Sequence, residues 1–440
     1  MSISSLPDDW SGTIGGSQDY GSSATIPPME GSDGAAHNGA VWTPWEAALE
    51  YNPTSADTVA VSIVPEKEGL FMFRHVVYAI EGTLPHMQTP VKVVRRYSDF
   101  IWLLECLTRI YPFRLLPTLP PKRFAVDGRY LSSDSYFLER RRRGLSRFVN
   151  QLIKHPVIRK EKLVQMFLTV DTELSVWRKE SSIQIEEEFT NRVISPSFVS
   201  GWDQREEDAK WQKIRSGAEV SLDVVAQLCF VVDRIHKRQD AMAQDYMKLS
   251  HGFKSLSESA SQLYSLDENG SDFGAIKDGI LSVSRYSSNA HSLSQDESRS
   301  TDADFLEDLK LYREILGSVF ELFARYEKFG GNNIDQLEQR IQQTERKIEL
   351  LTNKPDTRPG EIAKLKAAIT RDRKSIDFQT NRDWLIKECM TEELILCQRT
   401  QYQIAKSLKS WAGDCTKYSE LFKDNWTEMN NDAEHLPTLN

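Results

Sequence analysis

The stretch "KVVRRYSDFIW", residues 92–102, joins the end of a predicted strand to the start of a predicted helix. The β-branched residues before the arginines are typical of a strand, and Asp99 or the serine before it can cap a helix. Apolar residues then recur at helical spacing, at Trp102, Leu103, Cys106, Leu107 and Ile110. Consecutive side chains of a strand point to opposite faces, so only one of Arg95 and Arg96 can line a pocket. Arg96, beside Tyr97, is the candidate.

The sequence on both sides of this stretch predicts a small α+β domain. Residues 58–64 alternate in polarity and residues 69–82 are rich in aromatic and β-branched residues, so three strands in a meander are expected. Residues 112–124 contain four prolines and predict an extended loop rather than a helix. Helical periodicity resumes over residues 133–154. The domain predicted for residues 56–171 is therefore a three-stranded antiparallel sheet followed by helices.

Residues 203–435 predict an all-α domain of three long coiled-coil helices. Apolar residues recur at three- and four-residue spacing, for example in "DQLEQRIQQTERKIELL", residues 335–351. Breaks are predicted at the Ser-rich residues 292–305 and at residues 352–361, and a kink or brief interruption at residues 266–274. The predicted helices span residues 204–294, 302–352 and 361–431. Helices of this length can hardly bury their apolar stripes alone, which predicts antiparallel packing and a homodimer.

The charge of the chain is distributed unevenly. The formal net charge is −9, yet residues 91–160 hold sixteen bases against five acids. Residues 1–55 hold seven acids and no Lys or Arg, are rich in Ser, Gly and Pro, and show no hydrophobic period. The N-terminal segment therefore predicts a disordered acidic tail, and the basic segment predicts a local anionic partner.

Several classes of protein are disfavoured by the sequence. No apolar run is long enough to span a membrane, and the N-terminus has no signal-peptide pattern. Five widely spaced cysteines predict reduced thiols rather than disulfides or a metal site. A Gly-rich phosphate loop, HExxH and GxSxG are all missing from the sequence, so we expect no enzyme, no cofactor and no metal.

Three separate basic elements point to a phosphate ligand. They are "RRY" at residues 95–97, "LPPKR" at residues 119–123 and "FLERRRRGLSRF" at residues 137–148. Each alone is typical of a solvated basic surface, but together they indicate a binding site. The arginine fork matches the geometry of a phosphate, and Tyr97 offers a flat wall for a sugar or inositol ring.

In this order the three elements resemble the phox-homology (PX) domain, a phosphoinositide-binding module. The helical remainder resembles the BAR domain of sorting nexins, and "TNKPDTRPGEIAKLKAAI", residues 352–369, is similar to the tip of such domains. The resemblance covers about residues 56–435 and is closest to the branch of sorting nexin eight and its fungal counterpart. It implies a non-enzymatic protein that binds phosphatidylinositol 3-phosphate, senses or imposes curvature, and sorts and recycles cargo at endosomes.

The resemblance also assigns roles to four residues of this sequence. Arg96 matches the arginine that holds the 3-phosphate, and Tyr97 matches the aromatic residue under the inositol ring. Lys122, in the proline loop, matches the residue that contacts the 1-phosphate near the membrane. Arg141 matches the arginine that grips the 4- and 5-hydroxyls.

Two apolar segments are candidates for membrane insertion. The tip of the proline loop would let Leu115 and Leu116 enter the bilayer interface. The linker, residues 172–202, carries Phe189 and Val193 at helical spacing and could form an amphipathic helix that inserts. The three glutamates before Phe189 would repel an anionic surface, so packing against either domain is an equal alternative.

Because one headgroup gives only modest affinity, a second membrane-facing element is expected. Residues 338–374 hold ten bases against six acids, although the whole chain is acidic. The bases proposed to face the membrane are Arg346, Lys347, Lys354, Arg358, Lys364, Lys366, Arg371, Arg373 and Lys374, with Arg340 close by.

The resulting hypothesis is a cytoplasmic protein, peripheral on endosomal membranes. Its expected partners are phosphatidylinositol 3-phosphate membranes, a second copy of the chain, sorting cargo, and coat or fission proteins. Nucleic-acid binding and a purely structural coiled-coil scaffold are the alternatives, although no zinc-ligand spacing or RNP-like strand supports the former.

Overall fold

The computed structural model describes residues 50–64, 76–84, 89–121, 125–126, 129–130, 135–171, 174, 185–263, 271–352 and 360–438. The chain divides into two units, residues 1–40 and residues 41–440, and every described residue lies in the second. The predicted tail thus falls almost wholly outside the described residues. So do three of the predicted site residues, Lys122, Lys354 and Arg358.

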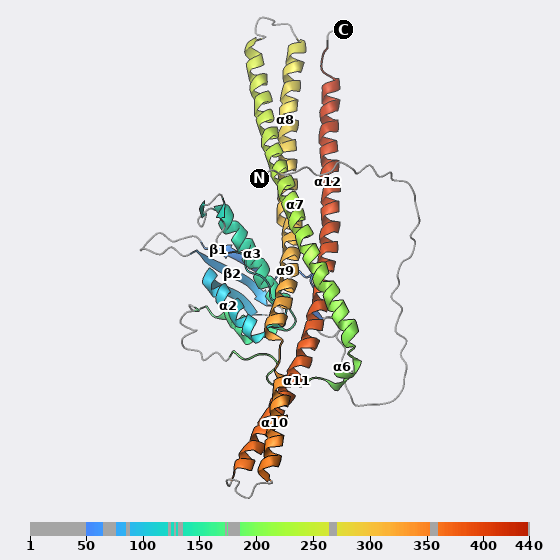
Figure 1. The fold of residues 1–440 in the computed structure, drawn as a ribbon. Helices are drawn as coiled ribbons and strands as arrows, with labels where there is room; N and C mark the ends of the chain where they lie inside the picture. The colour runs from blue at the N-terminus through green and yellow to red at the C-terminus, as the bar shows by residue number, and fades with distance from the viewer. Residues whose placement is uncertain are drawn as a thin grey trace, which may run out of the picture. The chain divides into compact units, whose positions relative to one another are not determined.

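The N-terminal part of the described chain contains a three-stranded antiparallel sheet in the order β1-β2-β3 (Figure 1). The strands are β1 (Val59–Ile63), β2 (Val77–Leu84) and β3 (Thr89–Arg96). Ile80 of β2 pairs with Val61 of β1 and with Val93 of β3, and all three side chains are buried. This alternation of buried and exposed residues confirms the predicted meander.

Helices cover the apolar face of this sheet and complete what we call the sheet domain. They are α2 (Tyr97–Ile110), α3 (Ser135–Lys154) and α4 (Lys162–Thr169), with a 3-10 turn η1 (Ile158–Lys160) and a short pair β4 (Ala125–Val126) and β5 (Arg129–Tyr130). Phe100 lies at the centre, with ring centroids 6.4, 6.2 and 5.2 Å from Tyr78, Phe148 and Phe167. The predicted α+β architecture is confirmed.

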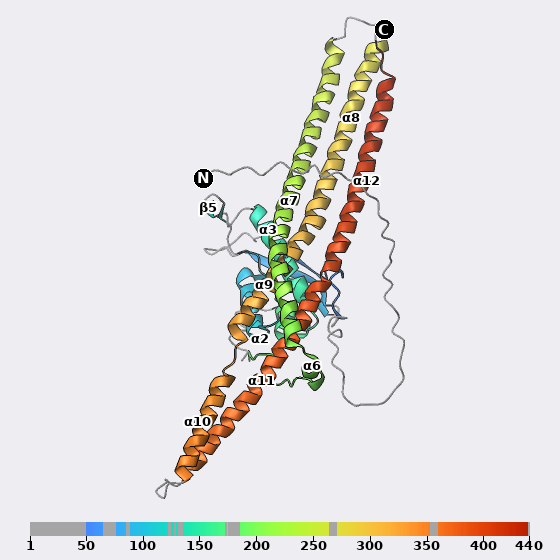
Figure 2. The same ribbon diagram turned by 45° about the vertical axis from the view of Figure 1, so that its right-hand side comes forward.

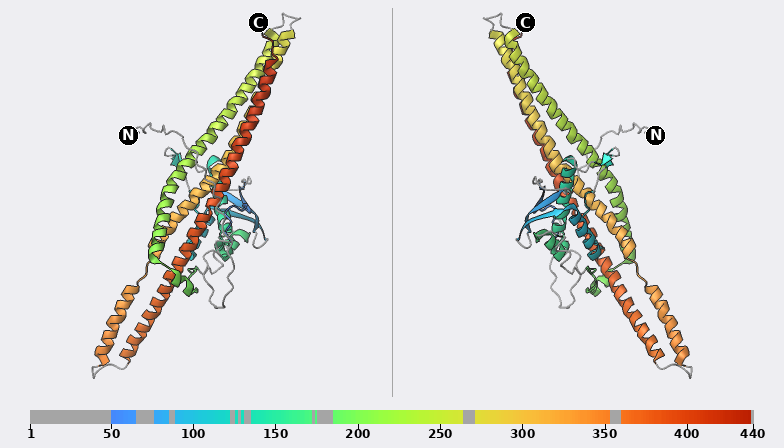
Figure 3. Two further views of the ribbon diagram at one scale, coloured as in Figure 1. Left: turned by 90° about the vertical axis from the view of Figure 1, so that its right-hand side faces the viewer. Right: turned by 90° about the vertical axis from the view of Figure 1, so that its left-hand side faces the viewer.

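The C-terminal part is helical and is called here the helical domain. Its helices are α7 (Gln204–Leu263), α8 (Ser271–Ser300), α9 (Leu306–Phe329), α10 (Ile334–Thr352), α11 (Glu361–Arg399) and α12 (Gln401–Glu434), preceded by the short α6 (Pro196–Gly201). In the views of Figures 2 and 3, α7, α8 and α12 run together, and α10 pairs with the first part of α11. The all-α prediction is therefore confirmed, but not all of its breaks.

The Ser-rich break predicted at residues 292–305 is wrong. That segment stays helical, with a π-helical turn at Thr301–Phe305 joining α8 to α9. Two of its serines have partners on other helices: Ser298 Oγ donates to the His236 carbonyl of α7 at 3.2 Å, and Ser300 Oγ donates to the Asp414 carboxylate of α12 at 2.8 Å. The predicted helix 204–294 instead ends at Leu263, and α8 runs back along α7.

A further helix end was not predicted. Between α9 and α10, residues 330–333 leave the helix, and Asn332 and Asn333 hydrogen-bond to α11. The Gly-Gly-Asn-Asn sequence at this point is a turn signal that explains the break.

A buried ionic cluster joins the sheet domain to the helical domain. Arg114, 2% exposed, donates to Glu188 at 2.8 Å and to Glu393 of α11 at 2.8 Å. His155 Nε2 lies 3.0 Å from the other oxygen of Glu393, while His155 Nδ1 accepts from the backbone N–H groups that follow it. Burial alone would raise the pKa of Glu393, but His155 and Arg114 lower it to about 2. The Glu393 carboxylate thus stays charged and links Arg114 and His155 of the sheet domain to α11.

The chain just before the sheet also belongs to the folded unit. Pro53 is buried, and the Thr54 carbonyl accepts from Lys406 of α12 at 3.1 Å. Glu50 pairs with Arg159 at 2.7 Å. Residues 50–55, predicted to lie in the disordered tail, therefore pack across both domains.

Candidate lipid-binding site

The two arginines at the end of β3 have different environments, as the strand alternation predicts. Arg95 is 1% exposed; its Nε donates to the Phe167 carbonyl at 2.9 Å and its Nη2 donates to the Val170 carbonyl. Burial lowers the pKa of Arg95, which is a structural residue that ties β3 to α4. Arg96 is exposed, and its backbone N–H donates to the Asp99 carboxylate at 2.9 Å.

The helix that follows begins directly at Tyr97, one or two residues earlier than the predicted caps. Asp99 lies in the first turn of α2, and its carboxylate accepts a hydrogen bond from the backbone N–H of Arg96. An acidic residue at this position stabilises the N-terminus of a helix. This tight junction places Tyr97 next to the exposed Arg96. The strand end and the helix start thus supply neighbouring parts of one site.

Arg141 lies over the ring of Tyr97. Its guanidinium carbon is 4.7 Å from the Tyr97 ring centroid and 4.3 Å from that of Phe137. The Tyr78 hydroxyl lies close by: burial raises the pKa of Tyr78, and Arg141 partly offsets this. Contact with two aromatic rings restrains the Arg141 guanidinium, which suits it to receive a ligand.

Three other arginines of α3 are engaged elsewhere. Arg142 donates to Glu139 and to the Val61 carbonyl at 2.8 Å. Arg143 pairs with Asp302 of the helical domain at 2.8 Å, and Arg147 pairs with Glu307 and Glu314 there. Of the residues predicted to form the headgroup site, the structure places Arg141 against Tyr97, and the exposed Arg96 directly precedes Tyr97 in the chain.

The proline loop is held against the same site. The Tyr97 hydroxyl donates to the Pro120 carbonyl, two residues before Lys122. On the other side, a Cβ on Gly144 of α3 would lie only 2.9 Å from Pro120 Cβ, so the loop packs directly on the helix backbone. Lys122 itself lies outside the described residues, and its contribution stays a prediction.

Replacing Gly144 by alanine is expected to disturb this contact. The added methyl would meet the Pro120 ring within 3.0 Å, and over-packing of this kind costs about 1 to 3 kcal/mol of folding free energy. Because Pro120 leads to Lys122, vesicle affinity should fall as well. The checks are urea denaturation and vesicle flotation of Gly144→Ala beside Gly413→Ala, where nothing lies within 4 Å of the added Cβ. Equal behaviour of the two variants would contradict the close packing of the loop.

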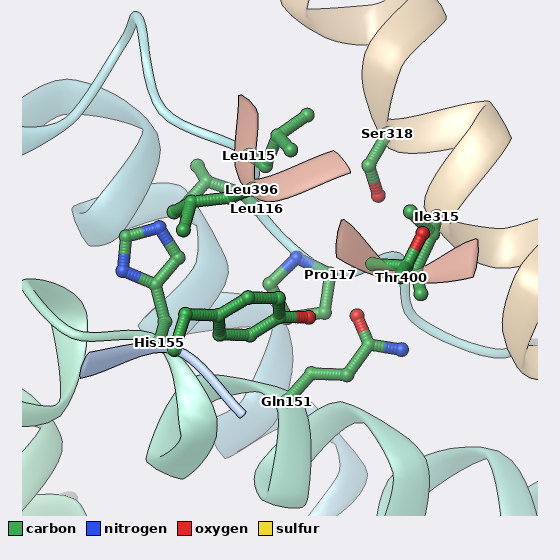
Figure 4. Close-up of a pocket in the computed structure, with 10 residues that line it drawn as sticks. Leu115, Leu116, Pro117, Gln151, His155, Ile315, Ser318, Leu396 and Thr400 are labelled. Atoms are coloured by element: carbon green, nitrogen blue, oxygen red, sulfur yellow. The ribbon is translucent and has the colours of Figure 1, made fainter. Parts of the chain in front are cut away.

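The insertion prediction for the proline loop is wrong. Leu116 is 1% exposed in the core of the sheet domain, and Leu115 packs with the core between the domains. Figure 4 shows both leucines lining a pocket with Leu396 and Thr400 of the helical domain. Leu116 is buried by the sheet domain and Leu115 packs against the cluster that contains the helical domain, which the sequence of the loop alone does not reveal.

The described part of the linker packs against the folded domains, which was one of its two predicted roles, and does not form a helix that inserts into a bilayer. Phe189, 2% exposed, stacks on Phe113 with ring centroids 5.9 Å apart, so it is not available for a bilayer. Phe198 and Trp202 pack near Trp384 of α11. Val193 is 86% exposed and keeps its insertion role only as a proposal. The described residues 185–203 contain the short α6 but no long amphipathic helix.

The predicted basic cluster lies on α10 and the first part of α11. Its described members are exposed: Arg340, Arg346, Lys347, Lys364, Lys366, Arg371, Arg373 and Lys374. Some are neutralised locally, since Arg340 donates to Asp372 at 2.7 Å and Arg373 pairs with Glu345 at 2.9 Å. Leu337, Ile341 and Ile369 are buried between the two helices, which directs the basic side chains outward.

Comparisons with known proteins agree with this architecture. The PX domain family matches residues 83–171, and the family described as Sorting nexin 8/Mvp1 BAR domain matches residues 182–440. The chain belongs to the sorting nexin family. PX and BAR domains are the lipid-binding modules of this family.

Individual relatives show how far the likeness extends. Sorting nexin MVP1 of Yarrowia lipolytica is 44% identical over 90% of this chain and 65% of its own length. Sorting nexin mvp1 of Aspergillus fumigatus is 43% identical over 87% of this chain and 51% of its own length. The cryo-EM structure of the SNX-BAR Mvp1 tetramer superposes with a TM-score of 0.70 at 32% identity, covering 85% of this chain and 100% of that one. The chain thus spans less than two thirds of the length of the Yarrowia lipolytica and Aspergillus fumigatus relatives.

No helix among the described residues combines the length and the apolar character needed to cross a bilayer. The site at Arg96, Tyr97 and Arg141 and the basic face of α10 and α11 are the two candidates for membrane contact that sequence and structure share.

Proposed function

We propose that this sorting nexin binds phosphatidylinositol 3-phosphate through Arg96, Tyr97, Lys122 and Arg141, and sorts cargo on endosomal membranes without catalysing a reaction. The observation that carries the proposal is the guanidinium of Arg141 held 4.7 Å from the Tyr97 ring, next to the exposed Arg96. Two arginine forks around a flat ring suit a phosphorylated inositol. Lys122, at the end of the loop fixed by Tyr97, would add the contact nearest the bilayer.

Flotation with vesicles that carry each phosphoinositide in turn tests this function. We expect binding to phosphatidylinositol 3-phosphate vesicles well above binding to vesicles with phosphatidylserine alone. Equal binding to every anionic vesicle would contradict a headgroup-specific site. Stronger retention on DNA than on any vesicle would favour the nucleic-acid alternative instead.

We also propose that the BAR helices form a homodimer, which can associate further. An apolar stripe runs along α7 away from its partners α8 and α9, and its members are 38–66% exposed: Val220, Val224, Leu228, Val231, Ile235, Met242, Leu249 and Leu256. The spacing of three, four and seven residues places them on one side of the helix. A solvent-exposed stripe this long fits a second copy of the chain. The tetramer named in the related structure supports association of more than one copy.

Replacing Leu228 by glutamate is expected to shift the protein to the 50.4 kDa monomer, because it buries a charge in the proposed interface. Mass measurement in solution checks this. Leu350→Glu, a substitution at a leucine that is 66% exposed on α10, is the matched control and should keep the wild-type mass. A wild-type protein that already measures as a monomer would remove the dimer proposal.

A further inference from the structure

A line of aromatic and basic side chains extends from the sheet domain onto the helical domain. Tyr136, in the first turn of α3, is 53% exposed. The guanidinium carbon of Arg140 lies 5.6 Å from its ring centroid, and Lys237 Nζ of α7 lies 6.0 Å from the same centroid. The start of α3 and the middle of α7 therefore share one surface (Figure 2).

The α7 side of this surface carries an exposed aromatic residue. Phe230 is 66% exposed, among the highest values for large apolar residues in the described chain. The Arg234 guanidinium lies 5.8 Å from the Phe230 ring centroid. Phe230, Arg234 and Lys237 are spaced by four and three residues, so they follow one line along the helix. We call Tyr136, Arg140, Phe230, Arg234 and Lys237 the α3–α7 patch.

The patch is positively charged although the chain is acidic. Residues 230–238 hold three bases and one acid, Asp233, which bonds Lys237 at 2.6 Å. The pKa of Lys237 is raised by that bond, so its ammonium group stays charged. The next acid along α7, Asp240, is exposed one turn further on. Arg140 and Arg234 thus give the patch a net positive charge.

The patch adjoins the candidate headgroup site. Phe137, the residue after Tyr136, packs on Arg141, which also contacts Tyr97. A bilayer bound at Arg96 and Arg141 would therefore meet Tyr136 and Arg140 within the same turn of α3. The line through Lys237, Arg234 and Phe230 would continue that contact along α7.

We propose that the α3–α7 patch is a second contact for an anionic bilayer, in which Phe230 and Tyr136 enter the interfacial region while Arg140, Arg234 and Lys237 meet lipid phosphates. This inference rests on the proposed phosphoinositide function and adds a site without headgroup specificity. Aromatic rings with a basic rim are suited to the boundary between headgroups and acyl chains. The specific site and the patch act together, because the second binds at high effective concentration once the first is engaged.

A second copy of the chain is the competing occupant, and the helix geometry disfavours it. At 100° per residue, Phe230 lies about 100 to 160° around α7 from Val224, Leu228 and Val231 of the exposed stripe. Interface cores are also depleted in charged residues, whereas the neighbours of Phe230 in the patch are basic. Charge complementarity therefore favours the anionic lipid surface.

The test is vesicle flotation of the full chain with Phe230→Ser/Arg234→Glu. Three vesicle types are needed: phosphatidylcholine with phosphatidylserine, with phosphatidylinositol 3-phosphate, and with both. One basic residue at an anionic leaflet accounts for about a fivefold change in affinity, so we expect at least that loss on phosphatidylserine vesicles. Preference for phosphatidylinositol 3-phosphate should survive, because Arg96 and Arg141 are unchanged. Arg299→Glu, on α8 with a side chain 67% exposed, is the matched charge reversal and should float like wild type.

Each outcome decides the inference. Unchanged flotation on phosphatidylserine vesicles, or a fall in solution mass that assigns the patch to a second copy, would overturn it. Should the double variant fail to fold by circular dichroism, Arg234→Gln alone gives the same readout. Arg96→Ala tests the proposed function separately. If this variant floats like wild type on phosphatidylinositol 3-phosphate vesicles, the proposed function fails. Flotation of the double variant on phosphatidylserine vesicles still tests the patch.

Discussion

Replacing Arg114 by methionine is expected to lower the free energy of unfolding by about 3 to 5 kcal/mol and to loosen the PX domain from the BAR helices. Removing one partner of a buried ion pair leaves the other charge uncompensated, which is the origin of this cost. Arg114 faces Glu188 at 2.8 Å, Glu393 at 2.8 Å and Glu392 at 3.5 Å, with only 3% of its side chain exposed. Its loss would leave three carboxylates together in a buried place.

The pKa directions support the same expectation. Burial by itself would lower the pKa of Arg114, but the facing carboxylates hold it well above its ordinary value. Glu392 already has a raised pKa through burial. Without Arg114 the remaining carboxylates would take up protons more readily, so the variant should lose stability most at neutral pH and least in acid.

Urea denaturation and hydrogen exchange of the domain interface measure both effects. The matched control is Arg299→Met, because Arg299 pairs with Asp296 on an exposed face and such pairs contribute about 0 to 1 kcal/mol. A loss below about 1 kcal/mol in Arg114→Met, or unaltered exchange at Leu115 and Phe189, would show that the cluster does not hold the two domains together.

The sequence could predict the local features of the site but not its long-range partners. Strand alternation separated Arg95 from Arg96, and the burial of Arg95 bears this out. Arg114 was overlooked because its carboxylate partners lie 74 and 279 residues away, a separation that no local pattern reveals. The only signal was an arginine in an apolar loop.

The same limit explains the errors on apolar residues. The prolines exclude a helix and so predict an exposed loop tip at Leu115 and Leu116, yet Leu116 is buried in the PX core and Leu115 packs against the core that includes the BAR helices. The Ser-rich stretch read as a break because serine favours caps and turns. In the folded chain Ser298 and Ser300 hydrogen-bond to groups on other helices, and these partners override the intrinsic preference.

Replacing Arg96 by alanine is expected to weaken binding to phosphatidylinositol 3-phosphate vesicles by about 10- to 100-fold, with little change in stability. A charge-assisted hydrogen bond contributes about 1.5 to 3 kcal/mol, and 1.4 kcal/mol corresponds to a tenfold change in affinity. Arg96 is exposed on the sheet domain, so its side chain adds little to the core. Arg141→Ala should weaken binding similarly but also cost stability, because it removes the contacts of Arg141 with Tyr97 and Phe137.

Lys92→Ala separates a specific site from general basic charge. Lys92 lies on the same strand and the same sheet face as Arg96, and its side chain is 86% exposed. If headgroup recognition resides at the end of β3, Lys92→Ala should retain wild-type affinity in flotation while Arg96→Ala loses it. Equal weakening by the two substitutions would mean that vesicle binding depends only on the summed charge of this face. Arg96, Tyr97 and Arg141 would then have no role in selecting the lipid.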